Sequence, residues 1–218
     1  MHAIHIKNPP LTHSDEPIDI TPSLDYIKEM GDNLSMTIRD LTIKTSFLLA
    51  LVTASRPSDL RKVNLTTMKD LNTSYSKSHS LTTSKSPTKK IYVGRYNDDP
   101  FLCPYNALQF LLSRTRSWRD NQKKQEALFL ITKPPHTPAA TDTIAGWIKT
   151  VIKMSAKDMR SLSAFFLQNA GGDISTILAL GNWFSNTTYQ RFYQRGIKLM
   201  LERNQVSKLI LDSATTHN

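Results

Sequence analysis

Residues 54–60 are Ala54-Ser55-Arg56-Pro57-Ser58-Asp59-Leu60, and this stretch follows the longest apolar run of the chain, around Phe47 to Val52. From about Met36 to Ala54, apolar side chains recur at helical spacing among good helix formers, which predicts a long, largely buried helix. Pro57 fixes a backbone angle suited to the first turn of a new helix. The sequence therefore predicts a break beside Arg56, between a core helix and the helix that follows it.

Further helices are expected on both sides of this break. Their predicted ranges are 21–30, 104–116, 142–153, 159–169, 174–180 and 187 to about 213, separated by turn residues such as Gly171-Gly172 and Gly181. Two short segments rich in β-type residues, Leu81–Thr83 and Ile91–Val93, flank Ser86-Pro87 and predict a small hairpin. The expected fold is mainly α with a small antiparallel β-hairpin sheet.

The charge of the chain indicates a polyanionic partner. The 218 residues include 28 Lys and Arg against 18 Asp and Glu, which gives a formal net charge of +10. A basic protein of this kind fits a DNA enzyme, an RNA binder or a ribosome-associated protein. Net charge alone does not distinguish these three classes, so the assignment depends on the order of particular residues in the sequence.

The cysteine count, the histidine spacing and the length of the apolar runs bear on the cellular compartment, on metal binding and on membrane association. Cys103 is the only cysteine, so an internal disulfide is impossible and a reducing intracellular compartment is expected. The six histidines form no i, i+4 pair, so no metal site is expected, and His136 is predicted to lie in the Pro-rich loop 133–138. No apolar run is long enough to cross a bilayer, so no membrane association is expected.

Two arginines are suited to holding a phosphodiester. Arginine donates two parallel hydrogen bonds to a phosphate and keeps its charge, which makes Arg56 and Arg160 candidates for a phosphate site. Lys157 precedes Arg160 by three residues, a spacing that places both heads on one side of a helix start. Taken singly, each arginine would be an ordinary surface residue and Tyr193 an ordinary core aromatic, so only their combination points to chemistry.

The combination resembles the tyrosine recombinase family. The stretch Ala54–Leu60 is similar to the family's first arginine box, and Lys157-Asp158-Met159-Arg160 is similar to its second. The segment Gly181–Tyr193 resembles the closing box, with Trp183 at the His/Trp position and Tyr193 at the nucleophile. Arg160-Ser161, Trp183 and the Leu102-Cys103-Pro104 entry to a helix resemble most the recombinases of DIRS-like retrotransposons and cryptons. The resemblance implies an integrase-like catalytic-domain fold.

The resemblance also implies a role for each residue. Tyr193 would attack the phosphodiester, Arg56 and Arg160 would hold its non-bridging oxygens, and Trp183 would pack beside the phosphate and donate its indole N–H. Asp59, one helical turn after Arg56, would orient that arginine. For Arg56 and Asp59 taken alone, surface residues in the first turn of a helix are the alternative.

Two lysines complete the implied site. Lys157 stands where most of the family has histidine and would donate to the same phosphate, which leaves open how Tyr193 loses its proton. Lys85 fits the hairpin lysine that acts as general acid toward the leaving oxygen. Lys77, Lys89 and Lys90 lie in the same region, and a solvated basic turn that grips the DNA backbone is the alternative interpretation.

Three segments are predicted: an extended lead-in at 1–20, the catalytic domain at 21–196, and a C-terminal helix at 197–218 that docks on its own core or on a neighbouring protomer. The family clamps DNA with a further N-terminal domain that residues 1–20 are too short to supply, so a fragment or truncated copy is expected. The implied partners are double-stranded DNA and further copies of the chain, a tetramer on DNA in the family, without a cofactor.

The expected function is that of a nuclear mobile-element recombinase, which cleaves and rejoins DNA through a 3′-phosphotyrosine. Three alternatives remain at this point. One is a domesticated copy that binds DNA without cutting it, another is relaxation of DNA in the manner of a type IB topoisomerase, and the third is an unrelated basic RNA-binding helical protein.

Overall fold

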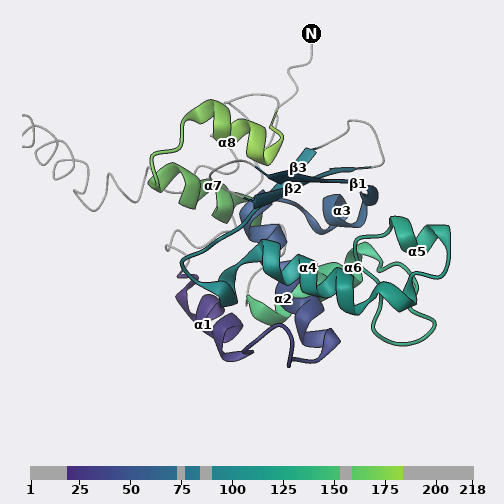
Figure 1. Cartoon of the computed structure of the whole chain (residues 1–218). Helices are drawn as coiled ribbons and strands as arrows, with labels where there is room; N and C mark the ends of the chain where they lie inside the picture. Colours follow the sequence, from purple (N-terminus) through teal and green to yellow (C-terminus); the bar gives the residue numbers. More distant parts are fainter. Residues whose placement is uncertain (1–18, 73–76, 84–89, 153–158, 184–218) are drawn as a thin grey trace, which may run out of the picture. The chain divides into compact units, whose positions relative to one another are not determined.

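The described part of the chain is mainly helical and carries one small sheet (Figure 1). A computed structural model describes residues 19–72, 77–83, 90–152 and 159–183. Its helices are α1 (Thr21–Glu29), α2 (Ile38–Thr53), α3 (Pro57–Arg61), α4 (Pro104–Arg114), α5 (Gln122–Glu126), α6 (Thr141–Val151), α7 (Met159–Asn169) and α8 (Ile174–Gly181), with 3-10 turns η1 (Pro100–Leu102) and η2 (Arg116–Trp118). The strands are β1 (Val63–Asn72), β2 (Lys77–Thr83) and β3 (Lys90–Gly94). The fold class predicted from the sequence is therefore confirmed.

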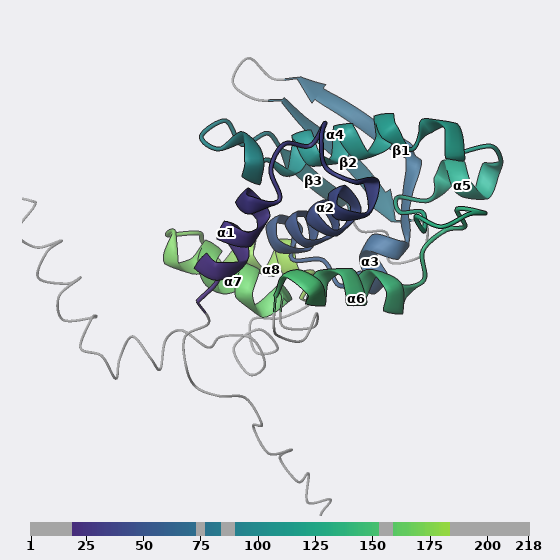
Figure 2. The ribbon, with the colours of Figure 1, turned by 90° about the horizontal axis from the view of Figure 1, so that it is seen from below.

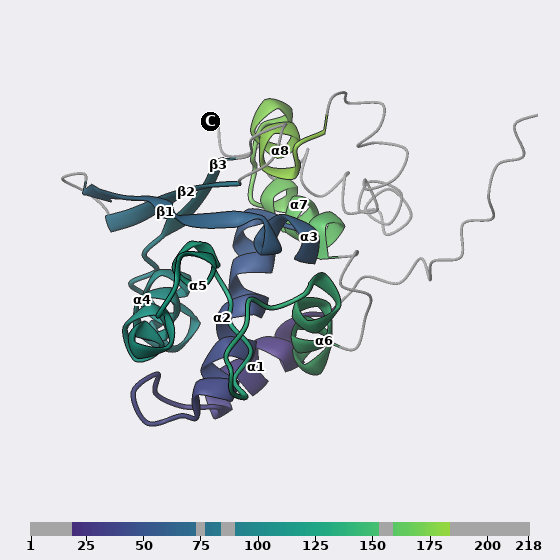
Figure 3. The same ribbon diagram turned by 90° about the vertical axis from the view of Figure 1, so that its right-hand side faces the viewer.

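Helix α2 is the centre of the core. Every residue from Leu41 to Ala50 is buried, and α2 packs against α4, α6 and α7. Figure 2 and Figure 3 show α2 running between α4 on one side and α6 on the other. Burial of each large aliphatic side chain stabilises the fold by about 1.5–3 kcal/mol, so this helix fixes the elements around it. Its start is capped by Thr37, whose Oγ1 accepts from the backbone N–H of Asp40 at 3.1 Å.

The sheet has the order β1-β2-β3 and is antiparallel throughout. The predicted hairpin is confirmed, since Leu81 pairs with Ile91 across β2 and β3. Strand β1 was absent from the sequence prediction because a bulge between Asn64 and Lys69 breaks its alternation. Within the bulge, Thr67 Oγ1 accepts from the N–H of Thr82 at 3.0 Å and replaces a ladder hydrogen bond.

The predicted helix boundaries agree closely with the structure. Helix α1 begins at Thr21, where the predicted catalytic domain begins, while the predicted segments 1–20 and 197–218 lie almost entirely outside the described residues. The helix predicted to start at Thr187 also lies outside them. No helix within the described ranges is long and apolar enough to cross a bilayer.

His136 lies in the predicted Pro-rich loop, but its ring is held in place. It stacks on Trp118 with the ring centres 3.8 Å apart, and its Nδ1 lies 3.1 Å from the carbonyl oxygen of Ile131. The short helix α5 was not predicted, because Gln122–Glu126 is polar throughout and has no apolar period to reveal it.

Lys44 is fully buried in α2. Its Nζ donates to the carbonyl oxygen of Gly31 at 3.2 Å and lies 5.8 Å from the centre of the Phe101 ring. Burial disfavours the charged form and lowers the pKa of Lys44 to about 8, although the carboxylates of Asp32 and Asp99 act in the opposite direction. Lys44 therefore ties the α1–α2 connection to the core at a cost to stability near neutral pH.

We expect Lys44→Met to raise the free energy of unfolding at pH 7 by about 1 kcal/mol or more, because the variant buries the same stem without a charge. Between pH 8 and 10.5 the unfolded chain still binds the Lys44 proton while the folded chain has released it. Wild-type stability should therefore rise with pH relative to the variant. Urea unfolding of both proteins at pH 7 and 9.5 measures this difference, and an identical pH dependence of the two would contradict the assignment.

Candidate phosphodiester site

The candidate site begins where α2 ends. Ala54 adopts a left-handed conformation with φ of 47°, which stops the helix and turns the chain toward α3. Arg56 is the N-cap residue of α3 and Pro57 its first residue, as the sequence predicted. Arg56 is exposed while Ala54 and Ser55 beneath it are buried, so a rigid turn presents this arginine to solvent.

Asp59 links the two arginine segments. Its Oδ2 accepts from the backbone N–H of Arg56 at 3.1 Å, and the same oxygen lies 3.8 Å from Nη2 of Arg160. The family resemblance implied that Asp59 orients Arg56. In the structure its carboxylate accepts from the backbone N–H of Arg56 and lies beside the guanidinium of Arg160. One carboxylate thus joins the start of α3 to the start of α7, about a hundred residues away along the chain.

Arg160 is held on several sides. Its Nε donates to the carbonyl oxygen of Ala54 at 3.3 Å, and its guanidinium lies 5.4 Å from the centre of the Trp183 ring. Only 6% of the residue is exposed. A buried guanidinium with fixed neighbours has little conformational freedom left, so its position is set before any ligand binds.

Trp183 reaches Arg160 because α8 ends in a tight turn. Asn182 takes a left-handed conformation with φ of 52°, and the N–H of Trp183 donates to the carbonyl oxygen of Leu178 at 3.0 Å. The Trp183 ring packs in an apolar cluster with Ala164 of α7 and Ile177 of α8. The turn residue is Asn182, and Gly181, which the sequence suggested as the separator, is the last residue of the helix.

Gly181 makes room for this ring. A Cβ at position 181 would overlap Cζ3 of Trp183, which is impossible without moving the indole. The sequence interpretation missed this role, although a glycine two residues before a site tryptophan was a usable signal. Ala54 gave no such signal, because its contribution is a backbone carbonyl.

We expect Gly181→Ala to lower the free energy of unfolding by about 1–3 kcal/mol, because overpacking forces the Trp183 ring away from Arg160. Gly146→Ala in α6 is the matched control, since a Cβ there meets nothing within 4 Å and should stabilise the helix by about 0.5–1 kcal/mol. Urea unfolding of the two variants checks the contrast, and equal effects would contradict the packing role.

Three predicted site residues, Lys85, Lys157 and Tyr193, lie outside the described residues, so their predicted roles stay predictions. The structure does describe what flanks Lys85. Strand β2 ends at Thr83, which pairs with Val63, two residues after the end of α3. The structure thus brings together Arg56, Asp59, Arg160 and Trp183.

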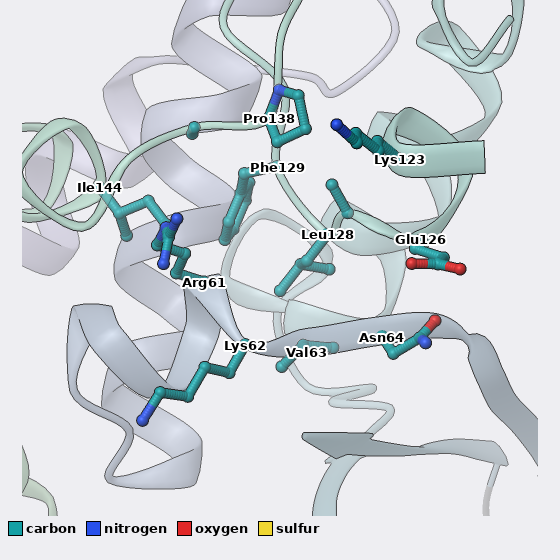
Figure 4. A pocket seen from close by; sticks show the side chains of 12 residues that line it. Arg61, Lys62, Val63, Asn64, Lys123, Glu126, Leu128, Phe129, Pro138 and Ile144 are labelled. Carbon is teal, nitrogen blue, oxygen red and sulfur yellow. The ribbon is translucent and has the colours of Figure 1, made fainter. Parts of the chain in front are cut away.

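A separate pocket of about 310 Å³ lies between the start of β1, α5 and α6 (Figure 4). Buried apolar side chains such as Leu128 and Phe129 form its floor, and Lys62, Lys123 and Glu126 lie around its edge. None of the four residues brought together at the candidate site lines it. Within the described ranges, no group of three or more His, Cys, Asp or Glu residues is placed to hold a metal ion.

This architecture is the catalytic-domain fold of tyrosine recombinases, as comparison with solved structures shows. The chain is similar to "FLP Recombinase-Holliday Junction Complex I", with a TM-score of 0.50 and 12% identity over 84% of this chain and 50% of that one. It is also similar to "Flpe-Holliday Junction Complex", with a TM-score of 0.50 and 14% identity over 80% of this chain and 46% of that one.

The chain thus spans about half the length of these two recombinases. A transposon integrase, that of Tn1549 in complex with transposon right-end DNA, matches with a TM-score of 0.45 and 16% identity over 88% of this chain and 67% of that one. No protein-family model matches the sequence, and no curated protein matches it.

Proposed function

We propose that the chain is a catalytic domain for DNA strand exchange, a site-specific recombinase that cleaves and rejoins DNA through Tyr193. One observation carries the proposal: Arg160 is buried on a tyrosine recombinase fold and held by Ala54, Asp59 and Trp183. A buried arginine fixed beside a second, exposed arginine segment suits the binding of a phosphodiester on which negative charge develops.

The proposed reaction is a reversible exchange of one ester for another. The phenolic oxygen of Tyr193 gives its proton to solvent and attacks phosphorus. The bond to the 5′ oxygen breaks, and that oxygen leaves as a hydroxyl with a proton from Lys85, which solvent replaces. Arg56 and Arg160 hold the non-bridging oxygens, and Lys157 adds a further cation. The 3′-phosphotyrosine conserves the ester bond, so a 5′ hydroxyl from another strand reverses the step without a cofactor.

The similar solved structures are complexes with DNA, which supports double-stranded DNA as the partner of this chain. We further propose that the recombinase belongs to a mobile element of the DIRS-like or crypton kind and acts in the nucleus. The support for this finer assignment is the sequence resemblance in Arg160-Ser161, Trp183 and the Leu102-Cys103-Pro104 helix entry.

Covalent capture on nicked DNA tests the proposal. The full chain is incubated in EDTA with a pool of nicked duplexes of randomised sequence, because a nick lets the cleaved 5′ end escape and traps the adduct. We expect a protein–DNA adduct that survives denaturant and can be sequenced to find the target site. Binding of duplexes without any adduct would contradict the proposed catalysis and favour a domesticated DNA-binding protein.

The stretch after Tyr193 contains Ile197, Leu199 and Leu201 and is proposed to dock between protomers. A chain ending at Gly196 should therefore lose assemblies larger than one protomer per DNA site while keeping its unfolding midpoint. Analytical ultracentrifugation on the trapped DNA site measures this, and unchanged assembly would exclude exchange through the stretch.

A further inference from the structure

We propose that the outer face of the sheet is a second DNA-contacting surface, which holds the backbone of the duplex that flanks the candidate site. The inference rests on the proposed function, because it names how the same duplex is held beyond the reacting phosphate. The outer face is defined here by Lys69 of β1, Ser80 and Thr82 of β2, and Lys90 and Tyr92 of β3.

The strand register places these residues on one side of the sheet. Lys69 pairs with Ser80, which pairs with Tyr92, and Thr82 pairs with Lys90, so they form two adjacent rows across the strands. The intervening residues face the other way, because side chains alternate along a strand. Leu81, Ile91 and Val93 are buried there.

Helices α2 and α4 cover that buried side of the sheet. Strand β3 contacts α2 and α4, and Figure 3 shows these two helices on the same side of the sheet. On the outer face, Lys69 and Lys90 are exposed and Tyr92 is 57% exposed. Exposed lysines together with a tyrosine and hydroxyl side chains are groups that proteins use to contact phosphates and sugars.

The charge of the outer face has one sign. The described strands contain a single carboxylate, Asp70, and its pairing with His79, opposite Val93, puts it on the helix-facing side. Neither Lys69 nor Lys90 has an ion-pair partner among the described residues. A surface of cations and hydroxyls without carboxylates complements the DNA backbone, whose binding releases counterions.

The dimensions fit a backbone running along the sheet. Strands lie about 4.8 Å apart and rise about 3.4 Å per residue, which separates the Lys69 and Lys90 backbones by roughly 12 Å. A duplex strand rises about 3.4 Å per nucleotide, so the two amines can reach phosphates a few nucleotides apart.

The outer face is also continuous with the candidate site. The row that contains Lys90 includes Asn64, two residues after Lys62 at the end of α3, whose start carries Arg56 and Asp59. A duplex whose phosphate reaches Arg56 therefore meets the Lys90 row before the Lys69 row. The outer face lengthens the grip on DNA on one side of the reacting phosphate.

Two measurements on the full chain test the inference. Lys69→Gln with Lys90→Gln should weaken binding of a 30-base-pair duplex by about tenfold or more at 0.1 M salt. The same change should reduce the salt dependence of binding by about 0.9 for each lost phosphate contact. The matched control is Lys133→Gln with Lys149→Gln, which removes two exposed lysines from the loop 133–138 and α6 and should change affinity less than twofold, roughly.

Acetylation of the wild type gives a local readout. Duplex DNA should slow acetylation of Lys69 and Lys90, measured by mass spectrometry, and leave Lys133 and Lys149 unchanged. Equal losses of affinity in both double variants would overturn the proposed DNA contact of the outer face, and so would a lack of protection of Lys69 and Lys90. Adduct formation by the wild type would still support the recombinase function in either case. Protection by polyglutamate but not by DNA would point to an acidic protein instead and would also overturn it. If the wild type neither binds duplexes nor forms an adduct, the proposed function fails with it.

Discussion

Tyr193→Phe is expected to abolish the denaturant-resistant protein–DNA adduct completely. The change removes one oxygen and leaves the shape and charge of the chain nearly unchanged, so affinity for duplex DNA should stay within about twofold of the wild type. Without the phenolic oxygen no ester to phosphorus can form, and the 5′ hydroxyl is never released. Gel electrophoresis of radiolabelled nicked substrate in denaturant measures the adduct directly.

The matched control is Tyr189→Phe, which removes the same atom from the other tyrosine of the closing segment. It should form the adduct at close to the wild-type rate. If Tyr193→Phe still forms the adduct and Tyr189→Phe does not, the nucleophile is Tyr189. If both variants form it, the attacking group is another residue and the assignment of the closing segment is wrong.

The fold was predictable where the sequence had a clear period. The long apolar repeat of α2, Pro57 after its end and the glycines near α7 and α8 each mark an element by a physical rule, and the structure has these elements. Strand β1 escaped prediction because its bulge places Thr66 and Thr67 out of alternation and satisfies them through Asn64. The extra residues of the bulge interrupt the period of two that would reveal a strand in the sequence.

The candidate site was predictable as a set of residues and not as a set of contacts. Arg56 and Arg160 are far apart in the chain, and only the resemblance of the two boxes joined them in the sequence. The atoms that hold Arg160 include the carbonyl oxygen of Ala54, which is available because that residue is left-handed. The contact between the Ala54 carbonyl and Arg160 could not be predicted from the sequence, because it depends on how α2 ends against α7 and not on the alanine side chain.

Arg160→Ala is expected to slow adduct formation by on the order of a hundredfold or more, with a smaller loss of DNA affinity. Charge on the non-bridging oxygens grows as the tyrosine oxygen approaches phosphorus, so a cation held at a fixed position stabilises the transition state more than the bound substrate. Because Arg160 is anchored by Ala54 and Asp59, its loss also leaves the Asp59 carboxylate without this neighbour. Single-turnover rates on the nicked substrate give the effect, and thermal unfolding shows how much of the protein remains folded.

Two further variants separate the phosphate role from a structural one. Arg160→Lys keeps the charge but not the planar fork that donates to Ala54 and faces Asp59, so it should recover only part of the rate. Arg61→Ala removes an exposed arginine from the other end of α3 and should leave the rate close to that of the wild type. If Arg160 holds the phosphate, the rate of adduct formation per folded molecule must be lower in Arg160→Ala than in the wild type. If the rate per folded molecule equals that of Arg61→Ala, Arg160 serves the junction of α2, α3 and α7 and not the reaction.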